Sequence, residues 1–255
     1  MDRIAIISDV HGNLPALEAV LEDIRSRGID TIYNLGDLVG SGPQPAEVVD
    51  VCRSACALMV RGNWDDIVGS QQEDVWEVTR WHRRQIGPER RAYLAGLPFA
   101  HDFWWSGLRV RLFHASPDDL YRHVYPHDVN TTLTTMFANS PATGMDVPTP
   151  DIVGYGDIHS PFVLSLDVEH KTLFNVGSVG LPVDRPLAAY AVMTGCADSR
   201  DARAFAIDIV RVPYDIERTA AAARRVGLPD CDAYCNELRL GVYRARHLAA
   251  RRRQS

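Results

Sequence analysis

Short apolar segments that end in polar residues alternate with helical patterns along the first third of the chain. Residues 4–8 are largely apolar and precede Asp9, and residues 14–27 carry apolar positions at helical spacing before Gly28, a typical helix-ending residue. The pattern repeats, which predicts further strands at 31–35 and 57–60 and a helix at 46–52. Repeated strand-helix units favour parallel strands, and ligands gather beyond the carboxyl ends of such strands.

The remaining residues are predicted to add a helical flank, a second sheet and C-terminal helices. Residues 71–97 are polar and helical in pattern, with a break at Gly87-Pro88. Strand patterns, which we assign to a second sheet, occur at 108–113, 152–154, 162–166, 172–176, 188–193 and 204–210. Helical patterns occur at 129–138, at 217–226 and at about 231–252. We therefore predict a single α/β domain that covers residues 1–255.

Composition and charge narrow the function classes. Hydrophobic residues make up 46% and charged residues 24% of the chain, as in folded globular proteins. The formal net charge of −6 argues against a nucleic-acid partner, although small anionic substrates remain compatible if metals supply positive charge. The first residues lack the features of a signal peptide, and no apolar run nears the ~18–20 residues that cross a membrane. We therefore expect a cytoplasmic protein without a membrane partner.

Residues that can bind metal ions follow several of the predicted strands. Asp9 and His11 follow the first strand, and the others are Asp37, Asn63, His114, Asp157 and His159. A single Asp at a strand end is as readily a turn or helix-capping residue, but its repetition at strand ends favours a shared site. Oxygen and imidazole donors without thiolates suit manganese, iron or zinc. Two such ions about 3.5–4 Å apart would hold a phosphate oxygen and activate a bridging water, which indicates phosphoester hydrolysis.

The order of these residues resembles the motifs of calcineurin-like metallophosphoesterases. The segments that carry the resemblance are Asp9-Val10-His11, Gly36-Asp37, Gly62-Asn63, His114-Ala115-Ser116-Pro117 and Gly156-Asp157-Ile158-His159, and they span most of the chain. Residues 175–180 are similar to the segment that follows the last ligands in the small bacterial phosphodiesterase branch. The resemblance implies an αββα sandwich of two mixed β-sheets flanked by helices.

The resemblance also implies a dinuclear metal centre. One metal would be held by Asp9, His11, Asp37 and His159, and the other by Asp37, Asn63 and His114, so that Asp37 bridges the two ions. The ions would be divalent manganese, iron, zinc, nickel or cobalt, with manganese favoured. A hydroxide that bridges the metals would attack phosphorus while Asn63 and His114 position the phosphate. The predicted catalytic residues are therefore Asp37, Asn63 and His114.

Two positions depart from the family pattern. Trp64 stands where many members have a histidine that protonates the leaving group, and Asp157 stands where a histidine is common and would itself be a metal ligand. Diesters with good leaving groups need less help from an acid, so we predict a phosphodiesterase that acts on a small phosphodiester or nucleotide. Alternative functions are a phosphomonoesterase, a dinucleotide pyrophosphohydrolase, and a catalytically weak metal- or nucleotide-binding sensor.

Residues around the motifs have more than one interpretation. Trp64 is a packing residue or, with Asn63, a substrate-binding residue whose indole forms an aromatic wall. Asp65 orients a metal ligand or caps the following turn. Histidines without motif support are interpreted as surface or core residues, at positions 82, 101, 123, 127, 170 and 247. The sequence leaves the substrate, the native metal pair and the oligomeric state open.

Overall fold

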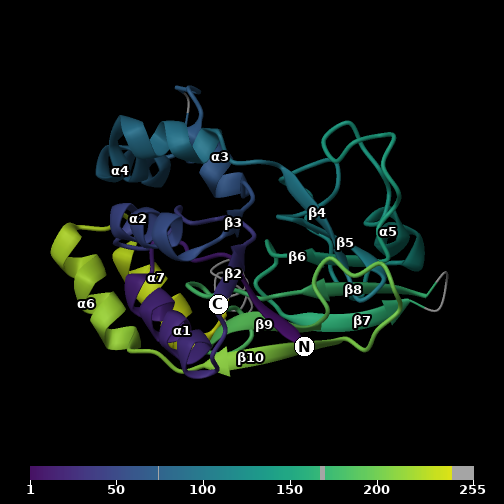
Figure 1. Cartoon of the computed structure of the whole chain (residues 1–255). Helices are drawn as coiled ribbons and strands as arrows, with labels where there is room; N and C mark the ends of the chain where they lie inside the picture. Colours follow the sequence, from purple (N-terminus) through teal and green to yellow (C-terminus); the bar gives the residue numbers. More distant parts are fainter. Residues whose placement is uncertain (74, 167–169, 243–255) are drawn as a thin grey trace.

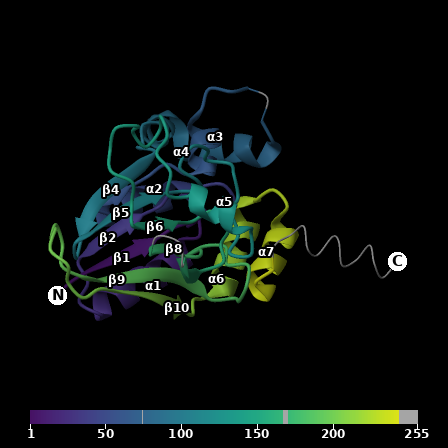
Figure 2. The same cartoon turned by 90° about the vertical axis from the view of Figure 1, so that its right-hand side faces the viewer.

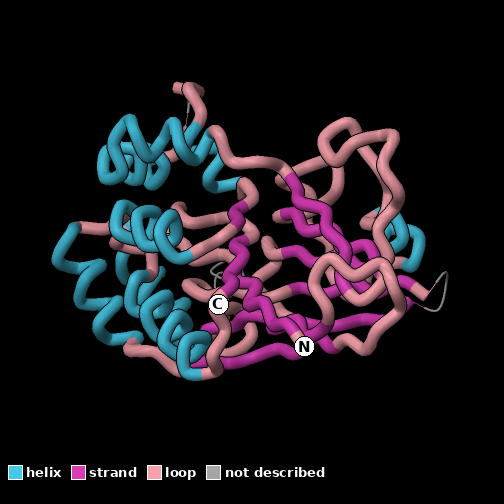
Figure 3. Tube along the Cα trace, viewed as in Figure 1, coloured by secondary structure: helices cyan, strands magenta, loops and turns pink. Residues whose placement is uncertain are grey.

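Two five-stranded β-sheets face each other, and helices cover their outer surfaces (Figure 1). The computed structural model describes residues 1–73, 75–166 and 170–242. Most helices lie on the side of the first sheet, and a short helix lies beyond the second sheet (Figure 3). Each sheet contains both parallel and antiparallel pairs, so the predicted α/β sandwich of two mixed sheets is confirmed.

The first sheet has the strand order β10-β9-β1-β2-β3. Its strands are β1 (Asp2–Ile7), β2 (Thr31–Asn34), β3 (Leu58–Met59), β9 (Ala188–Gly195) and β10 (Ala206–Val212). The first three are parallel, as predicted, and the last two join them antiparallel. The assignment of 188–193 and 204–210 to a second sheet is therefore wrong. β9 pairs with the edge of β1 that β2 leaves open and satisfies its backbone hydrogen bonds there.

The second sheet has the strand order β4-β5-β6-β8-β7. Its strands are β4 (Ala100–Trp105), β5 (Leu108–Phe113), β6 (Ile152–Tyr155), β7 (Phe162–Leu166) and β8 (Lys171–Asn175). β4 was not predicted. It is an edge strand whose side chains are mostly half-buried, so its sequence lacks a clear apolar alternation.

Clusters of buried apolar side chains hold the sheets and helices together. In β1, Ala5 and Ile7 face the helices of the first sheet, whereas Ile4 and Ile6 face the second sheet. This alternation follows from the two-residue period of a strand. On the far side of the second sheet, Val153 and other apolar side chains pack against the segment around α5 (Asn130–Thr135).

The long helices lie close to their predicted positions. They are α1 (Leu14–Ser26), α2 (Pro45–Ala55), α4 (Glu77–Ala95), α6 (Ile216–Val226) and α7 (Cys231–Leu240). The predicted break in α4 is present, because Gly87 has a φ of 71° directly before Pro88. The short α3 (Asn63–Gly69) was not predicted. Figure 2 shows α6 beside α7 at one end of the sandwich.

Part of the predicted C-terminal helix cannot be compared with the structure. Its residues 243–252 lie outside the described residues. Among the residues that the structure describes, every helix is too short or too polar to cross a membrane.

Candidate metal centre

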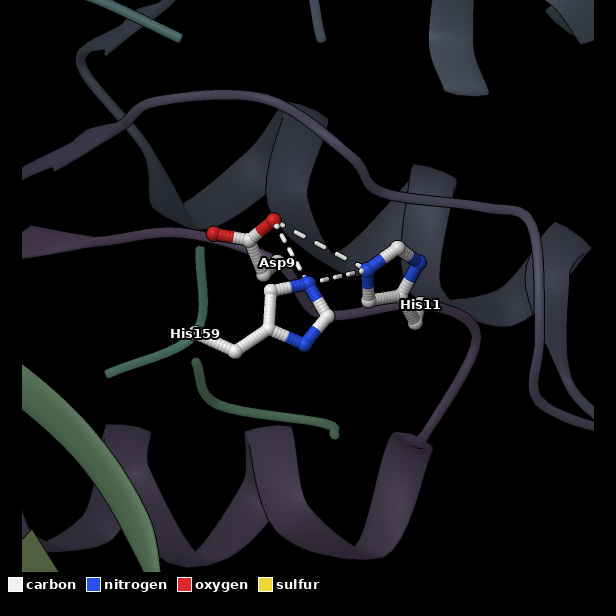
Figure 4. Close-up of side chains that lie close together, drawn as sticks. All are labelled: Asp9, His11 and His159. Atoms are coloured by element: carbon white, nitrogen blue, oxygen red, sulfur yellow. Dashed lines mark hydrogen bonds and ion pairs between the residues drawn. The ribbon is translucent and has the colours of Figure 1, made fainter. Parts of the chain in front are cut away.

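Loops at the carboxyl ends of strands from both sheets converge on one buried cluster. These loops follow β1, β2 and β3 of the first sheet and β5 and β6 of the second. They bring together all of the predicted ligands, namely Asp9, His11, Asp37, Asn63, His114, Asp157 and His159. His11 and His159 are 148 positions apart in sequence, yet their Nε2 atoms lie 3.0 Å apart (Figure 4).

Left-handed backbone conformations direct these side chains into the cluster. φ lies between 49° and 66° at Asp9, His11, Asp37, Asp157 and His159. This region costs a non-glycine residue about 1–2 kcal/mol, and Asp and His adopt it more readily than most residues. Such strain is common where a backbone is held in place for function. The concentration of strained residues among the predicted ligands therefore supports a functional cluster.

Two glycines allow the loops to approach each other closely. A Cβ atom at Gly156 would lie 2.6 Å from Asp9 Oδ2, and a Cβ atom at Gly62 would collide with Asp37 Oδ1. The N–H of Asp157 donates to Asp9 Oδ2 at 3.1 Å, which joins the loops of the two sheets. The glycines of these motifs are therefore required by close packing around the carboxylates.

Backbone carbonyl groups orient each imidazole of the cluster. The Nδ1 atoms of His11, His114 and His159 lie 3.0, 2.8 and 2.7 Å from the carbonyl oxygens of Val39, Leu35 and Leu181, respectively. A carbonyl oxygen only accepts hydrogen bonds, so each Nδ1 carries the proton and donates it. The Nε2 atom of each ring then keeps a lone pair for a metal ion.

Asp37 lies between two groups of ligand atoms. In the first group, Asp9 Oδ1 lies 3.2 Å from His159 Nε2 and 3.7 Å from His11 Nε2 (Figure 4). Asp37 Oδ2 lies 3.6 Å from His11 Nε2, whereas Asp37 Oδ1 lies 3.5 Å from His114 Nε2. One atom each from Asp9, Asp37 and His114 also lie within 4.8 Å of one another.

Buried atoms of the cluster lack hydrogen-bond partners among the described residues. They are Asp9 Oδ1, Asn63 Oδ1 and His114 Nε2. Leaving a buried polar atom unpaired costs about 1–3 kcal/mol. These atoms are oxygen and imidazole donors, which suit divalent cations such as manganese, iron and zinc. The residues of the cluster therefore fit the metal ions that the sequence implies.

Neighbouring charges shift the pKa values of the two central carboxyl groups in opposite directions. Burial, together with the carboxylates of Asp9 and Asp65, raises the pKa of Asp37. Burial also opposes ionisation of Asp9, but the imidazoles of His159, His114 and His11 outweigh it and lower the Asp9 pKa. Burial and the neighbouring His159 ring lower the pKa of His11 to about 3. Several acidic groups thus share one buried volume, where divalent cations would balance their charge.

Asp65 has both of the roles considered for it. Its carboxylate accepts hydrogen bonds from the N–H groups of Asp37 at 2.8 Å and Leu38 at 3.0 Å, which fixes the loop after β2. It also accepts from the Gly62 N–H at 3.1 Å, which caps the start of α3. This cap begins the helix that the sequence pattern did not reveal.

Asp157 connects the cluster to a residue that sequence reasoning missed. Its Oδ1 atom lies 3.4 Å from Asn63 Nδ2 and 3.9 Å from His114 Nε2. Its Oδ2 atom lies 2.6 Å from Nδ1 of His123, a half-exposed residue. This hydrogen bond and the charge of Asp157 raise the His123 pKa. His123 belongs to no motif and was interpreted as a surface or core histidine, so no sequence signal marked it for the site.

The cluster opens into a cavity of about 310 Å³. Ligand residues, polar residues and apolar residues line it, and these are His11, Asp37, Ser41, Asn63, Trp64, His123, Tyr125, Asp157, Ile158, His159, Leu181 and Val183. Trp64 also packs against the backbone, because a Cβ atom at Gly40 would lie 2.5 Å from its indole ring. The indole is thus both a packing group and a wall of the cavity.

Comparison with known proteins gives a consistent family assignment. The model of the calcineurin-like phosphoesterase superfamily domain matches residues 2–198. An uncharacterized protein of Methanocaldococcus jannaschii is 33% identical in an alignment of 255 positions, which covers 89% of this chain and 94% of the relative. The crystal structure of a metallophosphoesterase from Sphaerobacter thermophilus is 30% identical, with a TM-score of 0.70, and covers 94% of this chain and 99% of that one. Phosphodiesterase YfcE of Escherichia coli is 35% identical over 78 residues, which cover 27% of this chain and 42% of YfcE.

The sandwich fold, the ligand cluster and these relatives define a metal-dependent phosphoester hydrolase. The chain belongs to the calcineurin-like phosphoesterase superfamily. Divalent metal binding is supported by the grouped side chains of Asp9, His11, Asp37, His114 and His159.

Proposed function

We propose that this protein is a dinuclear metal-dependent phosphodiesterase that acts on a small phosphodiester or nucleotide. The position of Asp37 carries the proposal, because its two carboxyl oxygens face His11 at 3.6 Å and His114 at 3.5 Å. Donor atoms on both sides of this carboxylate suffice for two ions, and we favour manganese over iron, zinc, nickel or cobalt. When bound, two such ions supply Lewis acidity and a water of lowered pKa. The phosphodiesterase activity of YfcE agrees with this assignment.

The residues of the chain orient the site before a substrate arrives. The Trp64 N–H donates to Asp37 Oδ1 at 2.8 Å, and Asp65 accepts from the Asp37 N–H, so the carboxylate that would bridge the ions has a fixed direction. The Asn63 amide can donate to a phosphate oxygen. His114 keeps its Nε2 lone pair toward the centre because Leu35 binds its Nδ1. Asp37, Asn63 and His114 are therefore the proposed catalytic residues, and Asp157 is a proposed additional ligand.

The charge of the cavity favours a diester over a monoester. Among the described residues that line it are Asp37 and Asp157, but neither a lysine nor an arginine. A phosphate monoester carries more negative charge than a diester, so the carboxylates of this wall repel a monoester more strongly. Trp64 also removes the imidazole that the resemblance would place beside a monoester leaving group. Both features favour a diester with a leaving group that departs without strong acid assistance.

Hydrolysis of two chromogenic substrates tests the proposal. Metal-stripped protein resupplied with manganese is assayed on bis(p-nitrophenyl) phosphate and on p-nitrophenyl phosphate. We expect metal-dependent turnover of the diester and a loss of more than about 100-fold in Asp37→Asn, because the bridging ligand is removed. The matched control is Asp50→Asn, since Asp50 pairs with Arg90 outside the cluster and should be dispensable for turnover.

Each other outcome selects an alternative. Preference for the monoester would contradict the diester assignment and favour a phosphomonoesterase. Cleavage of a dinucleotide pyrophosphate without diester turnover would favour a pyrophosphohydrolase. If the protein binds two metals per chain but cleaves none of these compounds, the metal- or nucleotide-binding sensor replaces the enzyme.

A further inference from the structure

Aromatic surface continues from the metal cavity into a second hollow. Trp64 lines the metal cavity beside Asn63, and the ring of Trp76 lies 6.1 Å from that of Trp64, with 49° between their planes. Trp76 in turn lines a hollow of about 290 Å³ together with Ile67, Gln72 and Val75. Two indoles therefore connect the place where phosphate would bind to a neighbouring hollow.

The two indoles differ in how tightly they are packed and how far they are exposed. Trp64 is fixed, because its ring rests on the backbone at Gly40, where a side chain would not fit. Trp76 stands at the start of α4 with 67% of its surface exposed. An exposed indole next to a catalytic cavity serves no core packing, and such exposed apolar groups commonly mark binding surfaces.

Beyond the ligand cluster, His123 is the one basic side chain among the described residues that line the cavity, and it is hydrogen-bonded to Asp157. Among its described lining residues, the groups outside the ligand cluster include apolar Leu181 and Val183. Metal ions and Asn63 would hold the phosphate itself. Further affinity and selectivity must then come from contacts with the ester substituents, and flat aromatic groups stack well on indole surfaces.

We propose that Trp64 and Trp76 form a stacking subsite for a nucleobase, so that the substrates are phosphodiesters that carry a nucleoside on one side. This inference rests on the proposed phosphodiesterase function, because the subsite selects among its substrates. Trp76 is a specificity residue here. It lies beyond the ligand cluster and stacks on the base while the metal centre holds the phosphate.

A pair of substrates with one leaving group tests the subsite. Thymidine 5′-(p-nitrophenyl) phosphate and methyl p-nitrophenyl phosphate both release p-nitrophenol and differ only in the nucleoside. In the wild type, we expect kcat/KM to be about tenfold higher for the nucleoside diester. Trp76→Leu should raise KM for that substrate about tenfold with kcat unchanged, and should leave the methyl diester unaffected. Trp76→Phe should retain part of the preference.

A matched control and a binding measurement separate the subsite from catalysis. Trp104→Leu removes a tryptophan that lines a different hollow and contacts Arg200, so it should leave the preference intact. Equilibrium dialysis of thymidine 5′-monophosphate against inorganic phosphate measures base binding without turnover. We expect the nucleotide to bind about tenfold more tightly than phosphate in the wild type and equally in Trp76→Leu.

The outcomes distinguish the two proposals. Equal turnover of both diesters, together with nucleotide binding that Trp76→Leu does not weaken, would overturn the subsite and leave the phosphodiesterase standing. If neither diester is cleaved, the proposed phosphodiesterase fails, and the dialysis experiment alone then decides whether the indoles bind a base.

Discussion

After β1 the chain passes through Asp9, Val10 and His11, and after β6 it passes through Asp157, Ile158 and His159. In both segments φ is positive at the Asp and at the His. The surroundings differ. Asp9 is fully buried and faces the imidazoles of His11 and His159, whereas Asp157 points one oxygen toward His114 and binds His123 with the other.

The same local backbone therefore supports two tasks. The first segment is almost completely buried, and both its Asp and its His face the centre of the cluster. The second gives His159 to the centre but uses Asp157 to connect that centre with the wall of the cavity. A repeated Asp-x-His motif does not imply equal roles for the two Asp residues, because the tertiary contacts of each Asp determine what it binds.

Substitution of Asp9 or Asp157 by Asn should give the largest difference in turnover between the two segments. Asp9→Asn should lower metal-dependent turnover by more than about 100-fold, because it removes the anion between two imidazoles, whereas Asp157→Asn should cost about tenfold. Thermal unfolding with and without manganese gives an independent reading. Manganese at about 100 times the wild-type Kd should stabilise the wild type by about 2.7 kcal/mol. At the same concentration it should stabilise Asp157→Asn by less and Asp9→Asn hardly at all. Equal losses in the two variants would contradict the comparison.

The residue before each Asp provides the next test. Gly156→Ala should destabilise the protein by about 1–3 kcal/mol and weaken metal binding, because the added methyl group meets Ser8 and Asp9 of the other loop. Ser8→Ala should be nearly neutral, since the Ser8 hydroxyl has no partner among the described residues. Denaturant unfolding and metal titration measure both effects. Wild-type stability and affinity in Gly156→Ala would show that the loops do not need their close contact.

His123 is expected to have a smaller effect, confined to the second segment. His123→Ala removes the hydrogen bond to Asp157 Oδ2 and should lower metal affinity or turnover about tenfold. His123→Asn places an amide N–H near the position of the ring Nδ1 and should restore metal affinity. Metal titration of the two variants makes the comparison. If alanine and asparagine behave alike, His123 does not act through Asp157.

A buried imidazole outside both segments provides an effect that depends on pH alone. Neither ring nitrogen of His82 has a partner among the described residues, and burial lowers its pKa to about 3 from 6.5. Below pH 6.5 the unfolded chain binds a proton that the folded protein does not, so the His82 contribution to the unfolding free energy falls as pH drops toward 3. The slope is at most about 1.4 kcal/mol per pH unit.

Denaturant unfolding at pH 7 and pH 5 checks this expectation. His82→Gln should lose stability less steeply than the wild type as the pH falls, because glutamine does not titrate. Equal pH slopes in the two proteins would show that the imidazole is protonated in the folded state.

The strands that carry ligands could be predicted because each combines an apolar segment with a polar end. The sheet to which β9 and β10 belong could not be predicted. Neighbouring residues such as Tyr190 and Ala191 point to opposite faces of β9 and are both buried, so the local pattern would be the same in either sheet. α3 was hidden because seven residues are too few to reveal a helical period, and its start depends on the cap from Asp65.

The candidate site was predictable as a set of residues but not as a geometry. The candidate ligand residues occur at predicted strand ends, where parallel topology gathers them. The contact between Asp157 and His123 spans 34 positions and depends on the path of a loop without periodicity. The same limit applies to Trp76, whose approach to Trp64 follows from how α3 and α4 pack.

The distribution of the cluster over both sheets determines when metal can be captured during synthesis. His11 emerges from the ribosome 148 residues before His159, and the carbonyl that orients His159 belongs to Leu181. At typical rates of translation, this delay is on the order of ten seconds. During that time the segment with Asp9 and His11 lacks His159 and is an incomplete ligand set. Tight binding of metal is therefore expected only after the second sheet has been synthesised.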